Sequence, residues 1–401
     1  MKLTSEQKIF IREHEGEDIR NLALKLDKKR YSELDSMFLI KQIAGRQITK
    51  KKVPSWYEND NLIYPVHISL EQASSEATAQ YKASLFENST GSFIDLTGGL
   101  GVDFSFLSKM FSSSVYVEQN EALCNIAKNN FAQIGLENIS VINDTSENYI
   151  DSIDNDVCLI YLDPARRDDS GRKVVMIEDC SPDLTTIQDK LLKKSEIVLV
   201  KYSPMLDIDM ALKQLTYVSE VHIVSVDNEC KELLFKLEKN STDHQVVTVN
   251  IKNNGITEKF EYQLEDEAES LVSYSSEVLK YLYEPNASIL KAGAFKSVAQ
   301  RFNLFKLHPN SHLYTSDKLI EEFPGRTFEI TDSFSPNNKN IKYFKSQTTR
   351  ANVSVRNFPM SVLEIRKKTK IKDGGSIYLF ATTLNDNQKV WIVCKKAPIS
   401  N

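Results

Sequence analysis

The 401-residue sequence has few cysteines, few glycines and prolines, and no long apolar run. Its five cysteines are scattered and odd in number, which argues against a disulfide framework and against CxxC zinc sites. With 13 Gly and 11 Pro, the chain does not read as fibrous. No apolar stretch approaches the roughly 20 residues of a membrane span, and the charged N-terminus lacks the apolar stretch of a secretory signal. We therefore expect a cytoplasmic protein with no membrane partner.

Charge is distributed unevenly along the chain. The whole sequence has 50 Lys+Arg against 55 Asp+Glu, a formal net charge of −5. Residues 281–401 hold 19 basic and 9 acidic residues, so this part carries a net charge of +10 and residues 1–280 carry −15. Such asymmetry points to an anionic partner for the C-terminal part. A solvated basic face is the alternative interpretation.

The hydrophobic pattern divides the chain into five parts: a helical domain, an α/β core, a β-hairpin connector, a small α/β subdomain and a basic module (residues 1–88, 89–240, 241–275, 276–335 and 336–401). In the second part, seven short apolar runs alternate with helical stretches, which is typical of a doubly wound, Rossmann-like α/β fold. Before the core, Ser69–Phe86 predicts one long helix. In the last part, Lys342–Phe344 reads as extended.

A glycine-rich turn follows the first apolar strand, in the sequence FIDLTGGLGVD that ends at Asp103. Gly98, Gly99 and Gly101 would let the backbone pass close to a ligand and turn sharply into a helix. About twenty residues on, Glu118 ends the next strand, where a carboxylate can accept both hydroxyls of a ribose. The pattern predicts a cofactor that contains a nucleoside.

Acidic residues end three successive strands, at Asp95, Glu118 and Asp144. Asp95 would repel the pyrophosphate of a dinucleotide, whereas S-adenosylmethionine carries a cationic sulfonium and an amino group that a carboxylate favours. Asp144 lies where an adenine amino group could donate to it, although a turn or helix-cap role is the alternative. The three carboxylates favour S-adenosylmethionine over NAD. Thr97 and Asp103 complete the predicted cofactor-binding set.

The fourth strand delivers the sequence DPARR to the edge of the sheet where ligands bind. Asp163 and a carbonyl left exposed by Pro164 would accept hydrogen bonds from an amino group poised against a methyl donor. Arg166 and Arg167 would hold a substrate phosphate. We therefore predict the acceptor side of the reaction here, with Asp163, Pro164 and Arg166 as the catalytic residues.

Two further groups of residues predict substrate contacts. Lys201 ends the fifth strand, where it would contact a phosphate, pair with Asp163 or remain solvated, and Tyr202 would stack on the acceptor. In the C-terminal part, the basic run that includes Arg366, Lys367 and Lys368 predicts a surface that follows phosphates. A solvated face is again the alternative for that run.

Together, DLTGGLGVD, Glu118, Asp144 and DPAR resemble a class I S-adenosylmethionine-dependent methyltransferase, with a motif order closest to enzymes that methylate nitrogens of RNA. The whole chain resembles a bacterial family that joins such a core to a C-terminal THUMP-like domain. The stretches that carry this resemblance are Glu71–Glu76, DPARR, Lys201–Pro204, Tyr283–Pro285, Arg356–Pro359 and Ile365–Lys368. It implies a seven-stranded methyltransferase core, a ferredoxin-like subdomain at 276–335 and a THUMP-like domain at 336–401 that binds structured RNA.

The implied reaction is methylation of a nitrogen in structured RNA. Methylation of pyrimidine C5 requires a cysteine nucleophile, and neither DPARR nor KYSPM contains one, although Cys180 follows some way along the chain. The six histidines share no metal-ligand spacing, so we expect no metal. The alternatives are a small-molecule or protein methyltransferase, and a non-catalytic RNA-binding protein that retains the fold.

Overall fold

The computed structural model describes residues 2–25, 36–65, 67–154, 157–166, 176–241 and 244–398. Its chain divides into two units, one made of residues 1–221 and 231–243 and the other of residues 222–230 and 244–401. The five-part division inferred from the sequence is finer than this and stays a prediction. Within the described ranges, no helix is both long and apolar enough to cross a membrane.

The N-terminal part of the first unit is helical, with α1 (Ser5–His14), α2 (Ile19–Lys25), α3 (Ser36–Lys52) and α4 (Pro54–Tyr57). Thr4 begins α1 because its side chain accepts the Gln7 N–H while the Gln7 side chain accepts the Thr4 N–H. α3 ends just before Pro54, which cannot continue a helix. A small apolar core joins these helices through Phe10, Ile11, Leu22, Leu39 and Ile43.

Two short helices precede the core, α5 (His67–Gln72) and α6 (Glu76–Ser84). The prediction of one helix over Ser69–Phe86 is therefore wrong. Ser75 begins α6 as its N-cap by accepting the Thr78 N–H at 3.3 Å. The Ser74 hydroxyl instead donates to the carboxylate of Asp103 at 2.7 Å. The break between the helices thus carries a serine into the site described below.

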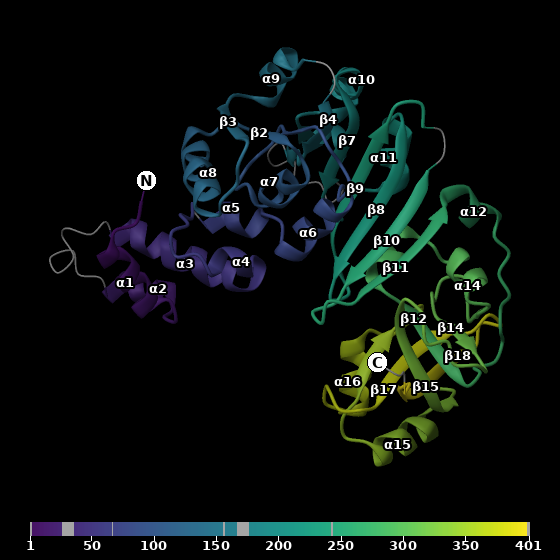
Figure 1. The fold of residues 1–401 in the computed structure, drawn as a ribbon. Coiled ribbons are helices and arrows are strands. Elements are labelled where there is room, and N and C mark those ends of the chain that lie inside the picture. Colours follow the sequence, from purple (N-terminus) through teal and green to yellow (C-terminus); the bar gives the residue numbers. More distant parts are fainter. Residues whose placement is uncertain are drawn as a thin grey trace. The chain divides into compact units, whose positions relative to one another are not determined.

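The large sheet has the strand order β3-β2-β1-β4-β7-β9-β8-β10-β11 (Figure 1). Its strands are β1 (Ser92–Asp95), β2 (Ser113–Glu118), β3 (Ile139–Asn143), β4 (Val157–Leu162), β7 (Ser195–Tyr202), β8 (Val218–Val226), β9 (Glu229–Glu238), β10 (Gln245–Ile251) and β11 (Thr257–Gln263). The strands β3, β2, β1, β4 and β7 pair in parallel, and β9 pairs antiparallel to β7. The Rossmann-like α/β fold class is confirmed, with two antiparallel strands beyond the seven predicted.

The two additional strands, β10 and β11, form the hairpin that the sequence suggested as a connector. The residues Val246–Asn250 of β10 are all buried, which a partner strand on each side explains. The sequence could show that these residues form a hairpin, but not which sheet edge the hairpin joins. The seven strands predicted for this sheet are therefore two fewer than its nine, and the hairpin accounts for the difference.

The helices between the strands are α7 (Val102–Leu107), α8 (Glu121–Gln133), α9 (Ser146–Ser152), α10 (Leu184–Lys194) and α11 (Ile208–Gln214), with short turns at η1 (Ser108–Met110) and η2 (Ile177–Asp179). A two-stranded ribbon of β5 (Ala165–Arg166) and β6 (Cys180–Ser181) follows β4. In the parallel register, Asp95 lies beside Tyr116 of β2 and Tyr161 of β4. The carboxyl ends of these strands therefore meet at one edge, where a doubly wound fold binds its ligands.

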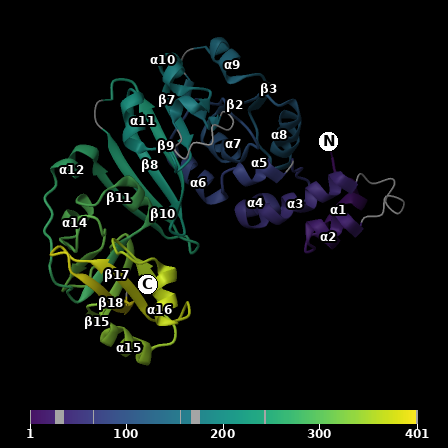
Figure 2. The same cartoon turned by 180° about the vertical axis from the view of Figure 1, so that it is seen from behind.

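The second unit has its own sheet, with the order β13-β14-β12-β15-β18-β17-β16. Its strands are β12 (Tyr281–Pro285), β13 (Phe305–Lys306), β14 (Tyr314–Ser316), β15 (Gly325–Phe334), β16 (Asn352–Val355), β17 (Tyr378–Thr383) and β18 (Lys389–Lys396). Its helices are α12 (Leu264–Glu269), α13 (Ala287–Ala292), α14 (Ser297–Arg301), α15 (Asn338–Gln347) and α16 (Val362–Thr369), and Figure 2 shows α15 and α16 from behind. This arrangement confirms an α+β C-terminal module.

One local prediction in this unit is wrong, because Lys342–Phe344 lies in the middle of helix α15 and is not extended. Asn337 caps the helix by accepting the Asn340 N–H at 2.9 Å. Ile341 and Phe344 then share one face and pack with Trp391 of β18. Ile341 and Phe344 are three residues apart, a spacing that indicates a helix. The short run Lys342–Phe344 obscured this signal.

Candidate active site

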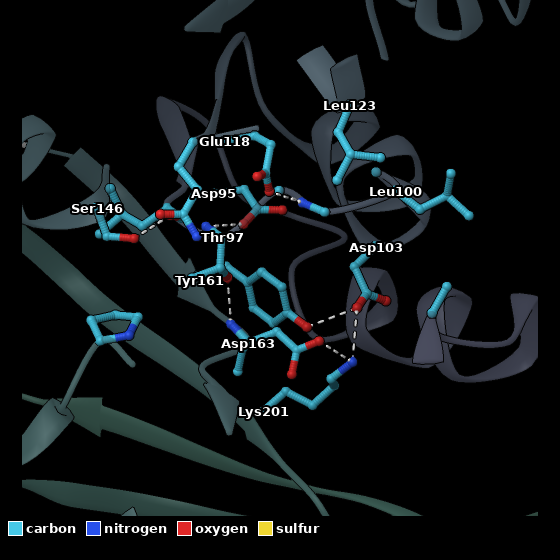
Figure 3. Close-up of a pocket in the computed structure, with 18 of the residues that line it drawn as sticks. Asp95, Thr97, Leu100, Asp103, Glu118, Leu123, Ser146, Tyr161, Asp163 and Lys201 are labelled. Atoms are coloured by element: carbon cyan, nitrogen blue, oxygen red, sulfur yellow. Dashed lines mark hydrogen bonds and ion pairs between the residues drawn. The ribbon is translucent and has the colours of Figure 1, made fainter. Parts of the chain in front are cut away.

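A cavity of about 280 Å³ opens at the carboxyl ends of β1, β2, β4 and β7 (Figure 3). All eight residues predicted to bind a cofactor line it, namely Asp95, Thr97, Gly98, Gly99, Gly101, Asp103, Glu118 and Asp144. The sequence placed them there because they follow strands in a doubly wound fold. The structure adds Ser146 and Tyr161 to the lining, neither of which the sequence singled out.

The glycine turn between β1 and α7 is shaped by its neighbours on β2 and α8. A Cβ on Gly98 would lie 2.2 Å from the ring of Tyr116, so only glycine fits there. Gly99 has a φ of +55°, which favours glycine, but a Cβ there would make only an ordinary contact, 3.7 Å from the Thr97 carbonyl oxygen. The Gly99 N–H donates to the carboxylate of Glu118 at 2.9 Å, and the Tyr116 hydroxyl donates to the Gly99 carbonyl. Glu118 therefore fixes the turn as well as lining the cavity.

Asp95 is the most buried carboxyl group of the cavity, with 1% of the residue exposed. It accepts the Thr97 N–H at 2.9 Å. Burial raises its pKa well above the usual range, and the negative charges of Asp103, Asp163 and Glu118 add to this effect. A cationic group bound in the cavity would offset part of the free-energy cost of ionising Asp95, whereas a phosphate would increase that cost.

Thr97 and Asp144 hold the surrounding loops. The Thr97 hydroxyl oxygen accepts the Asp163 N–H at 2.6 Å and so connects the ends of β1 and β4. Asp144 accepts the Thr145 N–H at 2.8 Å and the Asn148 side-chain amide at 3.2 Å. The structure thus places Asp144 in the turn before α9, whose N-cap is Thr145, and also at the cavity wall.

A network of buried charges lies beneath Asp163. Lys201 pairs with Asp163 at 2.5 Å and lies 3.7 Å from Asp103, as Figure 3 shows. Of the three roles that the sequence left open for Lys201, pairing with Asp163 is the one observed. Burial lowers the pKa of Lys201, but the carboxylates of Asp163, Asp103 and Glu232 outweigh burial and raise it, so Lys201 remains charged.

Asp103 is the centre of this network. It accepts hydrogen bonds from the Ser74 hydroxyl at 2.7 Å and the Tyr161 hydroxyl at 2.8 Å. Burial raises its pKa, but the ammonium groups of Lys82 and Lys201 outweigh burial and hold the pKa below its usual value. Asp103 is therefore ionised and fixes Lys201 from the side opposite Asp163.

Lys82 and Glu232 complete the network, and the sequence analysis missed both. The Lys82 side chain is 0% exposed, and its ammonium lies 3.2 Å from Asp103 and 2.5 Å from Glu232. The available signal was that Lys82 follows Ala79 by three residues on the buried face of α6. No local signal links it to Glu232, which lies 150 residues further along the chain.

A second, larger cavity of about 970 Å³ adjoins the first. The two cavities share six lining residues, Gln72, Ala73, Ser74, Asp163, Ala165 and Lys201. The second is further lined by Pro164, Tyr202 and three lysines, Lys51, Lys52 and Lys231. A molecule in each cavity would therefore meet the other at Asp163, and we name the larger one the acceptor cavity.

Tyr202 lines the acceptor cavity, and its hydroxyl is a buried polar atom. The residue is 3% exposed and its ring packs edge-on against Phe235. Within the described part of the chain, its buried hydroxyl has no hydrogen-bond partner. A buried hydroxyl left without a partner costs about 1–3 kcal/mol. This cost would be recovered if a bound molecule supplied the missing partner.

Some predicted residues cannot be placed in this site. Arg167 lies outside the described residues, and of Arg166 only the backbone is described, in β5. Arg366, Lys367 and Lys368 belong to α16 in the second unit. The Arg366 guanidinium donates to the carbonyls of Ala351 and Ile371 and pairs with Asp373, whereas the side chains of Lys367 and Lys368 are exposed.

Comparison with solved structures relates the whole chain to a Porphyromonas gingivalis W83 protein described as a candidate methyltransferase. The two share 32% sequence identity with a TM-score of 0.86, over 99% of this chain and 100% of that chain. This chain belongs to the same family. It is a class I methyltransferase family with a C-terminal THUMP-like domain, as the sequence resemblance implied. Residues 281–324 match a family described as a ferredoxin-like domain, and residues 325–396 match one described as THUMP domain-like.

More distant matches cover only part of this methyltransferase-family chain. An rRNA methylase from Streptococcus thermophilus is 16% identical with a TM-score of 0.32, over 41% of this chain and 96% of that one. A Streptococcus mutans protein solved in complex with SAH is 18% identical with a TM-score of 0.31, over 40% and 96%. Comparison with curated protein sequences found no match.

Proposed function

We propose that this protein transfers a methyl group from S-adenosylmethionine to a nitrogen atom of structured RNA. The observation that carries the proposal is that two cavities meet at Asp163 and Lys201. One cavity is acidic and of cofactor size, and the other is larger and lined by lysines. Methyl transfer needs this arrangement, because donor and acceptor must be bound at once and face each other. Membership of a methyltransferase family supports it.

The charges of the first cavity favour S-adenosylmethionine over a dinucleotide. Asp95, Glu118 and Asp144 line it, and the raised pKa of buried Asp95 reflects the crowding of negative charge. A sulfonium and an amino group would relieve this crowding, and the pyrophosphate of NAD would add to it. Asp95 would bind the amino group, Glu118 the ribose hydroxyls and Asp144 the adenine amino group. Bound there, S-adenosylmethionine supplies an electrophilic methyl carbon.

Asp163 would orient the acceptor. Its ion pair with Lys201 leaves carboxylate lone pairs that can accept a hydrogen bond from an N–H of the acceptor. Such a bond would point the nitrogen lone pair at the methyl carbon. The N–C bond would form as the C–S bond breaks, the bonding pair would stay on sulfur, and the nitrogen would lose its proton to Asp163 or to water.

The lysines of the acceptor cavity and the THUMP-like domain support RNA as the acceptor. Lys51, Lys52 and Lys231 would attract phosphates to the cavity. The C-terminal residues 281–401 carry an excess of positive charge. Titration calorimetry tests the cofactor assignment. We expect binding of S-adenosylmethionine and none of NAD, and binding of NAD alone would contradict the proposal.

Two glycine variants separate the packing of the turn from its contact with cofactor. Gly98→Ala is expected to lower the free energy of unfolding by about 1–3 kcal/mol, because its Cβ would collide with buried Tyr116. Gly99→Ala is expected to cost only about 1–2 kcal/mol for its left-handed backbone, yet to weaken S-adenosylmethionine binding, since Gly99 lines the cofactor cavity. Urea unfolding and calorimetry on both variants measure these effects. Unchanged cofactor affinity in Gly99→Ala would contradict the placement of the cofactor.

Tyr202→Phe tests the acceptor cavity. Because the hydroxyl has no partner within the described residues, its removal is expected to leave the melting temperature unchanged or raise it. The same variant is expected to raise the KM for RNA, since a hydrogen bond to the acceptor is lost. Steady-state methyl transfer and thermal unfolding measure the two effects. A lower melting temperature with unchanged KM would show that the hydroxyl serves the fold instead.

A further inference from the structure

Two sequence stretches of the second unit, Tyr283-Glu284-Pro285 and Arg356-Asn357-Phe358-Pro359, lie together although 72 positions separate their charged residues. Glu284 ends β12 and is 2% exposed. Its carboxylate accepts the Arg356 guanidinium at 2.9 Å and the Arg326 Nε at 2.7 Å. One buried carboxylate therefore holds two guanidinium groups, which leaves a positive charge uncompensated at this end of the sheet.

A loop that follows β13 brings further basic groups to the same place. The Lys306 ammonium donates to the Pro309 carbonyl at 2.8 Å and makes no ion pair with a described residue. His308 shares a hydrogen bond with the side-chain amide of Asn357 at 3.0 Å. Glu267, the carboxylate near Lys306, is occupied by the N–H groups of Lys296 and Ser297. These basic side chains are thus held by neutral partners.

Lys389 completes the group from β18. Its ammonium donates to the Thr383 hydroxyl at 3.0 Å, and that hydroxyl donates to the Asn357 carbonyl. Burial lowers the pKa of His308, and the positive charges of Lys389 and Lys306 lower it further. Burial also lowers the pKa of His312, to about 4, with smaller contributions from Lys306 and Arg356. Mutual effects of this kind require the charged groups to be close together. We call His308, Arg326, Arg356 and Lys389 the Arg356 surface; Lys306 adds its charge nearby but is buried, with 4% of the residue exposed.

We propose that the Arg356 surface binds the phosphodiester backbone of an RNA strand. Its two guanidinium groups are about 40% exposed at the side chain, and Lys389 and Asn357 are exposed. Two guanidinium groups that share one carboxylate, and an ammonium whose partner is a neutral hydroxyl, leave positive charge available for a phosphate. Residues matched to both C-terminal families contribute, so the surface exists only where the two modules join. The proposal relies on the proposed function only for RNA as the source of the phosphate.

We place on the Arg356 surface the phosphate contacts that the sequence predicted for Arg366, Lys367 and Lys368 of α16. Arg366 is occupied by two carbonyls and Asp373, as described above. Lys367 and Lys368 are exposed on α16, as is Lys370 at the C-cap of that helix. Lys367 therefore provides a matched control, because it is an exposed lysine of the same unit that lies outside the Arg356 surface.

The test is fluorescence anisotropy of the full chain with a labelled RNA hairpin, without S-adenosylmethionine, across a series of salt concentrations. Lys389→Ala is expected to weaken binding about tenfold at low salt and to reduce the salt slope by about one. Lys367→Ala is expected to leave both unchanged, and thermal unfolding checks the fold of each variant. An Arg356→Lys variant, which keeps the charge, is expected to lose affinity as well, because an ammonium cannot bind a phosphate in two places.

Several outcomes would overturn the proposal. Unchanged affinity in folded Lys389→Ala, or a loss confined to Lys367→Ala, would place RNA elsewhere. Displacement of the hairpin by low concentrations of inorganic phosphate would mean that the surface binds small anions instead. Binding is measured apart from methyl transfer, so a chain that binds RNA at this surface but methylates none would contradict the proposed function and leave this inference standing.

Discussion

Asp163→Ala is expected to reduce methyl transfer by a factor of about 10³, with little change in S-adenosylmethionine affinity. The reason is that Asp163 lies where the cofactor-sized cavity meets the acceptor cavity, and its carboxylate is held there by the ion pair with Lys201. Its main-chain N–H, which bonds to Thr97, is kept in the variant. Single-turnover transfer and calorimetry measure the two quantities separately.

The Asp163→Asn variant distinguishes two ways in which the carboxylate can act. An amide oxygen still accepts a hydrogen bond from an acceptor N–H but cannot take its proton. If Asp163 orients the acceptor, Asp163→Asn retains more activity than Asp163→Ala. If it acts as the base, both variants fall to the same level. Asp151→Ala, at an exposed aspartate on α9, is the control. Full activity in Asp163→Ala would remove this residue from the mechanism.

Lys82→Met is expected to lower the free energy of unfolding by about 3–5 kcal/mol. The ammonium of Lys82 lies between the carboxylates of Asp103 and Glu232, and its removal leaves two buried negative charges with less compensation. Urea unfolding measures the loss. Lys128→Met, at an exposed lysine on α8, is the control for a change from lysine to methionine.

The pH dependence of Lys82→Met checks the cause of the destabilisation. Burial already raises the folded-state pKa of Glu232, and without the ammonium of Lys82 it would rise further, while the pKa of Asp103 would rise from its lowered value. A carboxyl group with a raised folded pKa favours folding at low pH and opposes it as pH rises. The difference from wild type should therefore narrow toward acidic pH. Adding Glu232→Gln to Lys82→Met should recover part of the lost free energy of unfolding. If the difference in this free energy between Lys82→Met and wild type does not change with pH, the loss comes from packing alone.

The cofactor-side residues could be predicted because their pattern is local. A strand, a glycine turn and the next strand end are separated by short, fixed distances in sequence, and the parallel register then brings Asp95 and Glu118 together. The position of Lys201 could be predicted for the same reason, because it lies near the end of a strand that the local pattern indicates. Its pairing with Asp163 needed the structure, because strand ends fix positions and leave side-chain partners open.

The rest of the site depends on contacts between distant parts of the chain. Lys82 sits in a helix that reads as polar, and its burial arises because Glu232 and Asp103 converge on it from β9 and α7. The break between α5 and α6 has a similar cause, since Ser74 leaves the helix to bind Asp103. In the second unit, the Arg356 surface forms only when residues of β15 and β18 meet the segments that follow β13 and β16. No local sequence pattern indicates such contacts between distant parts of the chain.

The central claim is most directly tested by incubating the protein with S-adenosylmethionine carrying a deuterated methyl group and RNA from cells that lack the gene. The RNA is then digested and its nucleosides are analysed by mass spectrometry, with Asp163→Ala run in parallel. We predict one nucleoside that carries the labelled methyl group on nitrogen and that is absent with the variant. RNA in which every nucleoside remains unlabelled, from a preparation that binds S-adenosylmethionine, would contradict RNA methylation by this protein.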